Sequence, residues 1–415
     1  MDEWTPRIVS LGGLALMVLL ALVMSENRRK VSVRLVLAGC ALQFGFALLV
    51  LRTKPGEMFF EGARDAFEFM IRASNTGAGF LFGKLVTDVS LGAVLAFQVL
   101  PIVIFFSSLA GVLYHLGVTQ RVVRGIARLM RWAMNTSGAE TLACALFIFL
   151  GIEATTAIIE YIRRMTRSEL FTMMTAFMAT IAGSVMGAYA SFGCDPGHLL
   201  GASVMSAPAA IVIAKIMIPE TDEPLTRGHV RFEPPRESVN VIDAAARGAG
   251  QGLLLALNIG AMLIAFVGLV ALVNMLLGAA SGPMVGRGWL GEPVTLQRVL
   301  GYIASPLAYA MGLTSWSDAM AVGQLLGTRT VLNEFVAYQQ MQGLIAQGAL
   351  SPRAVVIATY ALCGFANFGS VAILIGGLGA IDPKRTSLLA SLGIRSMVSG
   401  MLACFMTACF AGMLA

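Results

Sequence analysis

Two carboxylate side chains in otherwise uncharged segments are the residues of this sequence best suited to bind a polar solute. Glu153 follows an apolar run that ends at Ile152, and Glu334 lies in T-V-L-N-E-F-V-A-Y (330–338). A carboxylate in apolar surroundings is costly unless helix ends or waters meet its charge. Held there, it can accept hydrogen bonds from hydroxyl or ring N–H groups, which fits a polyhydroxy or amide-bearing solute. The structural alternative is an ion pair with Arg329 or a contact with a helix end.

A second set of polar groups lies in C-G-F-A-N-F-G-S (363–370). Asn367 can donate and accept hydrogen bonds at once, which suits a pair of ribose hydroxyls or the edge of a base. An earlier segment, A-T-I-A-G-S-V-M (179–186), shares with this region the tripeptide G-S-V. That segment is interpreted either as a place where helices pack closely or as a helix break whose carbonyl oxygens line a cavity.

The other ionisable residue types form no recognisable site. Glu160 and Asp318 are weaker candidates, and Glu160 lies near the end of its segment, where a structural role is expected. The three histidines are far apart, and no two of the six cysteines form a C-x-x-C pair. We therefore expect no metal site, no disulfide framework and, without a nucleophile–base pair, no enzyme.

The composition requires a solvent other than water. Of the 415 residues, 57% are hydrophobic and 13% are charged, and the mean hydropathy is +0.79. Soluble domains carry about 25% charged residues and need a polar surface, so an ordinary soluble protein and a disordered chain are excluded. The net charge of +6 comes from short segments between apolar runs, which is the pattern of cytoplasmic loops and not that of a nucleic-acid-binding protein.

The uncharged runs predict an all-α polytopic membrane protein with eight transmembrane helices and two re-entrant helical hairpins. The predicted spans are Ile8–Ser25, Leu35–Leu51, a segment within Val89–Leu116, 168–194, 196–217, 253–278, 354–381 and 386–414. The basic segment S-E-N-R-R-K (25–30) places the first loop in the cytoplasm and the N-terminus outside.

Two amphipathic helices are predicted beside the spans. Residues 56–72 alternate charged and aromatic residues, which is typical of a helix in the outer interface. A second helix carries Arg121, Arg124, Arg128 and Arg131 on one face. We expect this basic helix to face cytoplasmic solvent or headgroups, with a specific lipid or regulatory site as the alternative.

Two interrupted segments are predicted as the hairpins. Residues 140–164 contain two short apolar pieces around Glu153, and this hairpin opens from the cytoplasm. Residues 297–341 turn at T-S-W-S-D (314–318), open from outside and continue through Glu334 in one arm. In each half, a hairpin carboxylate is followed by G-S-V within a span. The halves therefore form an inverted repeat, an arrangement that places substrate near the bilayer midplane between broken helices.

Four segments are specific enough to indicate a family. They are A-T-I-A-G-S-V-M-G-A-Y-A-S-F-G (179–193), A-S-V-M-S-A-P (202–208), T-V-L-N-E-F-V-A-Y (330–338) and A-L-C-G-F-A-N-F-G-S-V-A-I-L-I-G-G-L-G (361–379). These segments, and the helix order over nearly the whole chain, closely resemble the concentrative nucleoside transporter family. The resemblance implies a homotrimer in which a transport domain slides against a trimerising scaffold, an elevator mechanism.

The resemblance also implies a domain division. Scaffold helices are expected within 1–116 and at 253–278, and a cytoplasmic loop at 218–252. The two inverted repeats, 117–217 and 295–415, would form the transport domain.

The same resemblance implies roles for single residues. The substrate-binding residues that it implies are Glu153, Val185, Glu334, Phe365, Asn367 and Ser370. Glu153 and Val185 correspond to contacts with the base, and the other four correspond to the ribose-binding group and its pocket.

The first hairpin departs from the family. Its tip reads G-I-E-A-T-T where the family usually has G-Q-T-E-A-P, so polar contacts to the base are missing. Sodium-coupled members carry an asparagine four residues before that glycine. The matching residue here is Phe147, or Leu146 with another gap placement, and neither offers the side-chain oxygen that a hard cation needs. Thr180, Ile181 and the hairpin position Leu150 would be the remaining parts of an ion site.

We predict a secondary active transporter that imports nucleosides across the cytoplasmic (inner) membrane without a cofactor. The possible coupling ions are Na⁺ and H⁺, and the degraded site favours sodium-independent uptake driven by a proton, through Glu153 or Glu334, or by downhill flux. One alternative is a sodium-independent or proton-coupled carrier of a modified nucleoside or related ribosyl compound. Another is a transporter-like sensor that binds nucleoside without moving it. The expected partners are nucleoside, the lipid bilayer and further copies of the chain, and no nucleic acid.

Overall fold

The computed structural model describes residues 4–88, 95–226, 238–288 and 291–415, without the side chains of Thr87, Glu153, Thr156 and Ala157. Every regular element among these residues is a helix, as the sequence predicts. The beginning of the predicted third span (89–94) and residues 227–237 of the predicted cytoplasmic loop lie outside the described residues.

The first half of the chain contains helices of very different lengths. They are α1 (Trp4–Val23), η1 (Arg28–Lys30), α2 (Val33–Arg52), α3 (Lys54–Phe82), α4 (Lys84–Thr87), η3 (Leu95–Val99), α5 (Leu100–His115), α6 (Val118–Met134), α7 (Gly138–Phe147), η4 (Ile152–Ile158), α8 (Ile159–Ile162), α9 (Arg167–Ala179), α10 (Gly183–Ser191) and α11 (Pro196–Met217).

The second half begins with the longest helix. Its elements are α12 (Val241–Gly286), α13 (Leu296–Ala310), α14 (Trp316–Val331), α15 (Glu334–Ala346), α16 (Pro352–Leu362), α17 (Phe368–Ile381), η5 (Pro383–Arg385) and α18 (Thr386–Leu414).

Seven helical segments of the described chain are long and apolar enough to cross a membrane. They are Trp4–Val23, Val33–Arg52, Leu95–His115, Arg167–Ser191, Pro196–Met217, Val241–Gly286 and Pro383–Leu414. These segments coincide with seven of the predicted spans. The remaining predicted span, 354–381, is divided between the shorter apolar helices α16 and α17.

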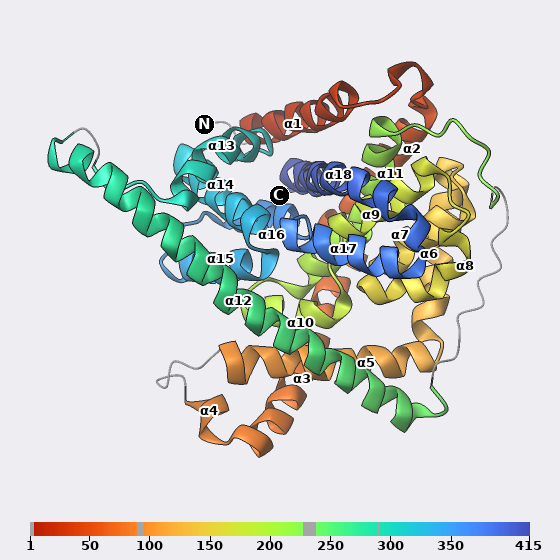
Figure 1. Cartoon of the computed structure of the whole chain (residues 1–415), viewed down its shortest axis with the longest axis horizontal. Helices are drawn as coiled ribbons and strands as arrows, with labels where there is room; N and C mark the ends of the chain where they lie inside the picture. Colours follow the sequence, from red (N-terminus) through yellow and green to blue (C-terminus); the bar gives the residue numbers. More distant parts are fainter. Residues whose placement is uncertain (1–3, 89–94, 227–237, 289–290) are drawn as a thin grey trace.

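The helices form a buried centre with an apolar exterior. α18 packs against α1, α9, α11, α16 and α17, and α12 packs along α5 and crosses one face of the molecule (Figure 1). Arg167–Ser191 and Pro196–Met217 are almost entirely buried, whereas most residues of α1, α2 and α12 are exposed or only half-buried. Exposed apolar surface of this extent requires lipid or a partner subunit around it.

Two predicted continuous spans are broken, which corrects the sequence-based prediction. The span 168–194 is interrupted at 180–182, where Thr180 adopts an extended backbone (φ −122°, ψ 164°). The span 354–381 is interrupted at 363–367, and Asn367 is likewise extended (φ −142°, ψ 165°). Both interruptions are apolar or nearly so, so the hydrophobic runs continue through them. The segment 179–186 therefore contains a helix break, and it also packs closely, since a Cβ atom on Gly183 would lie 3.0 Å from the Phe149 carbonyl oxygen. That its carbonyl oxygens line a cavity stays a prediction.

The second hairpin also differs from the prediction. The predicted turn at 314–318 lies at the junction of α13 and α14, and a further break at Leu332 and Asn333 separates α14 from α15, so three helices take the place of the two predicted arms. In chain order, the pair that corresponds to the first hairpin is α14 with α15. Glu334 is therefore the first residue of α15 and not part of a continuous arm. The Asn333 side chain caps this helix by accepting a hydrogen bond from the Val336 amide at 2.9 Å.

Two further helices are longer than predicted. The amphipathic helix expected at 56–72 extends over Lys54–Phe82, and the span expected at 253–278 extends over Val241–Gly286. α12 thus begins inside the predicted loop 218–252. Asn240 caps it through a hydrogen bond from the Asp243 amide at 2.9 Å.

The order of elements repeats in the two halves. In each half an amphipathic helix (α6 or α13) precedes a broken pair, a second broken pair and a long buried helix (α11 or α18). The broken pairs are α7 with η4 and α8, α9 with α10, α14 with α15, and α16 with α17. This order supports the internal repeat inferred from sequence.

A buried ionic cluster joins the ends of α7, α9 and α11. Lys215 Nζ lies 2.7 Å from Glu140 Oε2 and 3.1 Å from Glu220 Oε2, and it donates to Ser168 Oγ at 3.0 Å. Ser137 Oγ donates to Glu169 Oε1 at 2.5 Å. These contacts attach the first hairpin arm to the two buried helices beside it.

Candidate functional site

The broken helices of the two halves meet at their interruptions. The Phe365 amide donates to the Thr180 carbonyl oxygen at 3.3 Å, and the Gly183 amide donates to the Phe149 carbonyl oxygen at 3.0 Å. The chain must approach closely here, since a Cβ atom on Gly364 would lie 2.6 Å from the Met178 carbonyl oxygen. The first hairpin, the α9–α10 break and the α16–α17 break are thus connected through backbone groups.

Glu334 is held by two buried donors at this junction. Asn367 Nδ2 donates to its Oε2 at 3.1 Å, and Tyr189 Oη donates to its Oε1 at 2.9 Å. All three residues are buried. Glu334 also occupies the first turn of α15, where the helix dipole favours a negative charge. Three separate elements therefore converge on one carboxylate.

Asn367 makes two different contacts with its amide group. Its Oδ1 accepts from the Ser370 amide at 2.8 Å and so caps α17, while its Nδ2 holds Glu334. Ser370 lies one turn into α17 and is buried. The predicted cluster of Glu334, Asn367 and Ser370 is thus brought together in the structure.

Tyr189 is a member of this cluster that the sequence reasoning missed. It lies four residues after Val185 on α10, so both side chains fall on one helical face. Its ring packs on Tyr338 with the ring centroids 4.6 Å apart. The signal that could have found it is this spacing from a predicted contact residue.

The ion pair with Arg329 that was considered for Glu334 is absent. Arg329 is fully buried and its Nη1 donates to the Ala361 carbonyl oxygen at 2.5 Å, while its guanidinium carbon lies 5.3 Å from the centroid of the Phe405 ring. Among the described residues Arg329 makes no ion pair. Its contacts therefore fix the end of α16, and Glu334 is held by neutral donors instead.

Of the two residues predicted to contact the base, the structure describes the side chain of only one. Val185 is buried on α10. Glu153 belongs to η4, but its side chain lies outside the described part of the structure. η4 packs against α17, because a Cβ atom on Gly377 would lie 3.1 Å from Ile152 Cγ1. The backbone that carries Glu153 is therefore next to the helix that follows Asn367.

One of the four positions implied for an ion site, Phe147, carries an aromatic ring that packs in a row with two others. Phe147 is buried and its ring centroid lies 5.6 Å from that of Phe177, which in turn lies 5.6 Å from that of Phe365. The Thr180 hydroxyl donates to the Ala176 carbonyl oxygen at 2.8 Å. Ile181 is buried beside it, and Leu150 is half-buried at the hairpin bend. Three rings in a row thus connect the first hairpin to the α16–α17 break.

The weaker carboxylate candidates have other surroundings. Asp318 accepts hydrogen bonds from the Ser351 amide at 3.2 Å and the Ser351 hydroxyl at 2.8 Å, so it fixes the start of α16. Glu160 is exposed. Within the described residues there is no group of three or more His, Cys, Asp or Glu side chains that could hold a metal ion.

Comparison with known protein families identifies one family along the chain. The family described as "Na+ dependent nucleoside transporter C-terminus" matches residues 198–412, and its N-terminal counterpart matches residues 12–85. A third description, "Nucleoside recognition", matches residues 96–194.

Individual proteins agree with this assignment. The chain is 42% identical to an "Uncharacterized transporter" of Haemophilus influenzae, with 97% of each chain covered. It is 40% identical to "Solute carrier family 28 member 3" of Mus musculus, over 98% of this chain and 59% of that protein.

A solved structure of CNTnw in an inward-facing substrate-bound state is 38% identical and superposes with a TM-score of 0.90, covering 99% of this chain and 98% of that one. An outward-facing structure of a CNTnw variant also gives a TM-score of 0.90. The helix order, the broken spans and these similarities agree, and the chain belongs to the concentrative nucleoside transporter family, whose members are membrane transporters and not enzymes.

Proposed function

We propose that this chain carries nucleosides across the cytoplasmic membrane into the cell. The observation that carries the proposal is the buried contact between Asn367 and Glu334 at the junction of broken helices. A carboxylate accepts hydrogen bonds from hydroxyl groups and an amide both donates and accepts, so the pair can hold the two neighbouring hydroxyls of a ribose. Similarity to CNTnw in a substrate-bound state supports the same assignment.

In this proposal the nucleoside lies between the two halves of the chain. Its ribose contacts Glu334, Asn367 and Ser370, with the Phe365 ring beside it. Its base extends toward Glu153 and Val185. The packing of η4 against α17 supports this orientation, because it brings the first hairpin next to the helix that carries Ser370.

We further propose an elevator mechanism in a homotrimer whose N-terminus lies outside. The transport domain would consist of the inverted repeats 117–217 and 295–415, and the scaffold would include α12 and the helices within 1–116. The contrast between the buried α9, α11 and α18 and the apolar exposed faces of α1, α2 and α12 supports this division. The similarity to both inward-facing and outward-facing CNTnw structures supports a moving carrier.

We propose that this carrier does not use sodium, in contrast to the description of its family. Sodium must exchange its water shell for several oxygen ligands. Phe147 presents a ring, which offers no oxygen ligand, at the position where the family supplies an asparagine oxygen. A proton, through Glu153 or Glu334, or downhill flux of the nucleoside would then drive uptake.

Counterflow in proteoliposomes tests whether the protein carries or only binds nucleoside. Vesicles loaded with unlabelled uridine should accumulate external labelled uridine transiently, and Glu334→Gln should reduce this accumulation about tenfold or more because a buried contact is lost. Glu160→Gln is the matched control, since Glu160 is exposed and should leave counterflow unchanged. Tight uridine binding without counterflow would contradict transport and would favour a sensor.

A further inference from the structure

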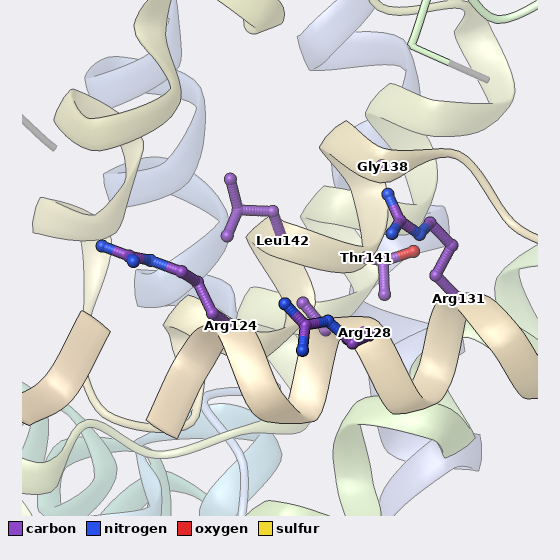
Figure 2. A pocket seen from close by; sticks show the side chains of 7 residues that line it. Arg124, Arg128, Arg131, Gly138, Thr141 and Leu142 are labelled. Carbon is purple, nitrogen blue, oxygen red and sulfur yellow. The ribbon is translucent and has the colours of Figure 1, made fainter. Parts of the chain in front are cut away.

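The basic helix α6 borders a cavity that the proposed transport site does not use. The cavity lies between α6 and the first turns of α7 and has a volume of about 180 Å³. In Figure 2 the side chain of Arg131 lies beside Gly138 and Thr141 of α7, whereas that of Arg124 extends away from them on the other side of Leu142. Together with Arg128, both line the cavity. One water needs roughly 10–15 Å³ of such space, so the cavity has room for a polyatomic ion.

The lining of this cavity is strongly positive. Three of the lining residues are arginines and none of those lining residues is acidic. Guanidinium groups donate in a planar fork that matches the oxygens of a phosphate group. Arg128 is exposed, so its guanidinium group can be reached from outside, and Arg124 (exposed) and Arg131 (half-buried) line the cavity beside it.

The arginine side chains, and not the backbone of α7, would bind the anion. The first amides of α7 already have acceptors, since the Gly138 amide donates to the Thr226 carbonyl oxygen at 3.1 Å and the Ala139 amide to Thr226 Oγ1 at 3.3 Å. The Thr141 hydroxyl donates to the Ser137 carbonyl oxygen at 2.5 Å. The helix end therefore contributes its dipole, while the hydrogen bonds would come from α6.

The surface of α6 places this cavity beside the membrane. Val122, Leu129 and Trp132 are exposed apolar residues on α6, and Trp132 is 81% exposed. The buried face of the helix contains Val123, Met130 and Met134. The helical spacing puts the arginines between these two faces. A helix with an exposed apolar face and an arginine row is typical of one that lies in the interface plane, at the depth of lipid phosphates.

We propose that this cavity is a phosphate-binding site, occupied by the headgroup of an anionic phospholipid or by a free phosphate group. A phosphate bound there links α6 to the first arm of the first hairpin through charge-assisted hydrogen bonds. The site is distinct from the Glu334 cluster and does not depend on which solute the protein carries.

Thermal unfolding of the full chain in detergent tests this proposal in two arms. One arm compares inorganic phosphate with sodium chloride at equal ionic strength. The other arm compares short-chain phosphatidic acid with short-chain phosphatidylcholine. At least one of the two phosphate ligands should raise the unfolding midpoint temperature of the wild-type chain. In the Arg124→Gln/Arg128→Gln double variant, the ligand concentration that gives half of this rise should be at least fivefold higher. Arg121→Gln is the matched control on the same helix, since Arg121 does not line the cavity.

The pattern of responses decides both the site and its occupant. A shift with phosphatidic acid only identifies a lipid headgroup, and a shift with inorganic phosphate identifies a free anion. If the double variant does not fold, Arg128→Gln alone and native mass spectrometry of retained anionic lipid give the same comparison. Equal responses to phosphate and chloride, together with equal responses to the two lipids, would overturn the proposal. So would an Arg121→Gln variant that loses the response as fully as the cavity variants.

Discussion

At the scale of single residues, the side chain of Asn367 connects a helix end to a buried carboxylate. Its oxygen caps α17 and its nitrogen orients Glu334, so the position of the carboxylate is tied to the position of a helix end. Tyr189 fixes the second carboxylate oxygen from a different element. A carboxylate held by two donors is pre-positioned for a solute, which lowers the ordering cost of binding.

We predict that Asn367→Ser weakens uridine binding by about 1–3 kcal/mol. Serine keeps an acceptor that can cap α17, but it is too short to reach Glu334, so the change separates binding from helix capping. Isothermal titration calorimetry measures the effect. The wild-type chain should bind uridine more tightly than 2′,3′-dideoxyuridine, and the variant should lose much of that preference. Equal binding of both ligands by the wild type would show that the ribose assignment is wrong.

The sequence predicts the members of this cluster unevenly. Glu334, Asn367 and Ser370 can be found because each is polar within an apolar run and lies in a recognisable segment. Tyr189 could not be found in this way, because a tyrosine in an apolar helix is compatible with ordinary packing. The aromatic row through Phe177 also depends on contacts between segments far apart in the sequence, which no local pattern encodes.

At the scale of helices, the interruptions of α9–α10 and α16–α17 position the site. Hydropathy does not reveal them, because residues such as Ile181 and Ala366 continue the apolar runs. They become visible only through packing, where Gly364 lets the two breaks approach each other. Hydropathy also does not reveal the start of α12, because the charged residues near Asp243 have the composition of a loop.

We predict that Gly364→Ala separates these two breaks. The added methyl group would lie 2.6 Å from the Met178 carbonyl oxygen and 2.7 Å from Cys404 Sγ, so the backbone must move. The expected loss of folding stability is about 1–3 kcal/mol, with weaker uridine binding. Gly376→Ala is the control, because no atom lies within 4 Å of its added Cβ. Thermal unfolding in detergent and calorimetry check both variants, and unchanged stability and binding in Gly364→Ala would contradict the account.

The ionic cluster at Lys215 supports a further prediction about how helices are joined. Lys215→Met should lower stability by about 3–5 kcal/mol, because Glu140 would remain buried without its cation. Adding Glu140→Gln should restore part of the loss. As a control, Arg247→Gln removes an exposed pair with Asp243 and should change stability little. Stability is measured by thermal unfolding. If Lys215→Met and Arg247→Gln lowered stability equally, the cluster would not be what joins α7 to α11.

At the scale of the whole molecule, the repeated order of elements explains why one cluster draws on both halves. Each half contributes broken helices, and the halves meet where Phe365 and Thr180 are hydrogen-bonded. The sequence indicates this repeat through one shared tripeptide and two hairpin carboxylates. It does not indicate that Phe147 lies in a row with Phe177 and Phe365, since that follows from contacts between segments far apart in the sequence.

We propose that this member of a family described as sodium-dependent moves nucleosides without sodium. The decisive measurement is the uptake of labelled uridine into proteoliposomes in sodium buffer and in choline buffer, with and without an imposed pH gradient. We expect equal initial rates in the two buffers, and a higher rate under an inward proton gradient if protons are coupled. A steep, saturable dependence of the rate on external sodium would contradict it and would show that other oxygens complete an ion site near Thr180.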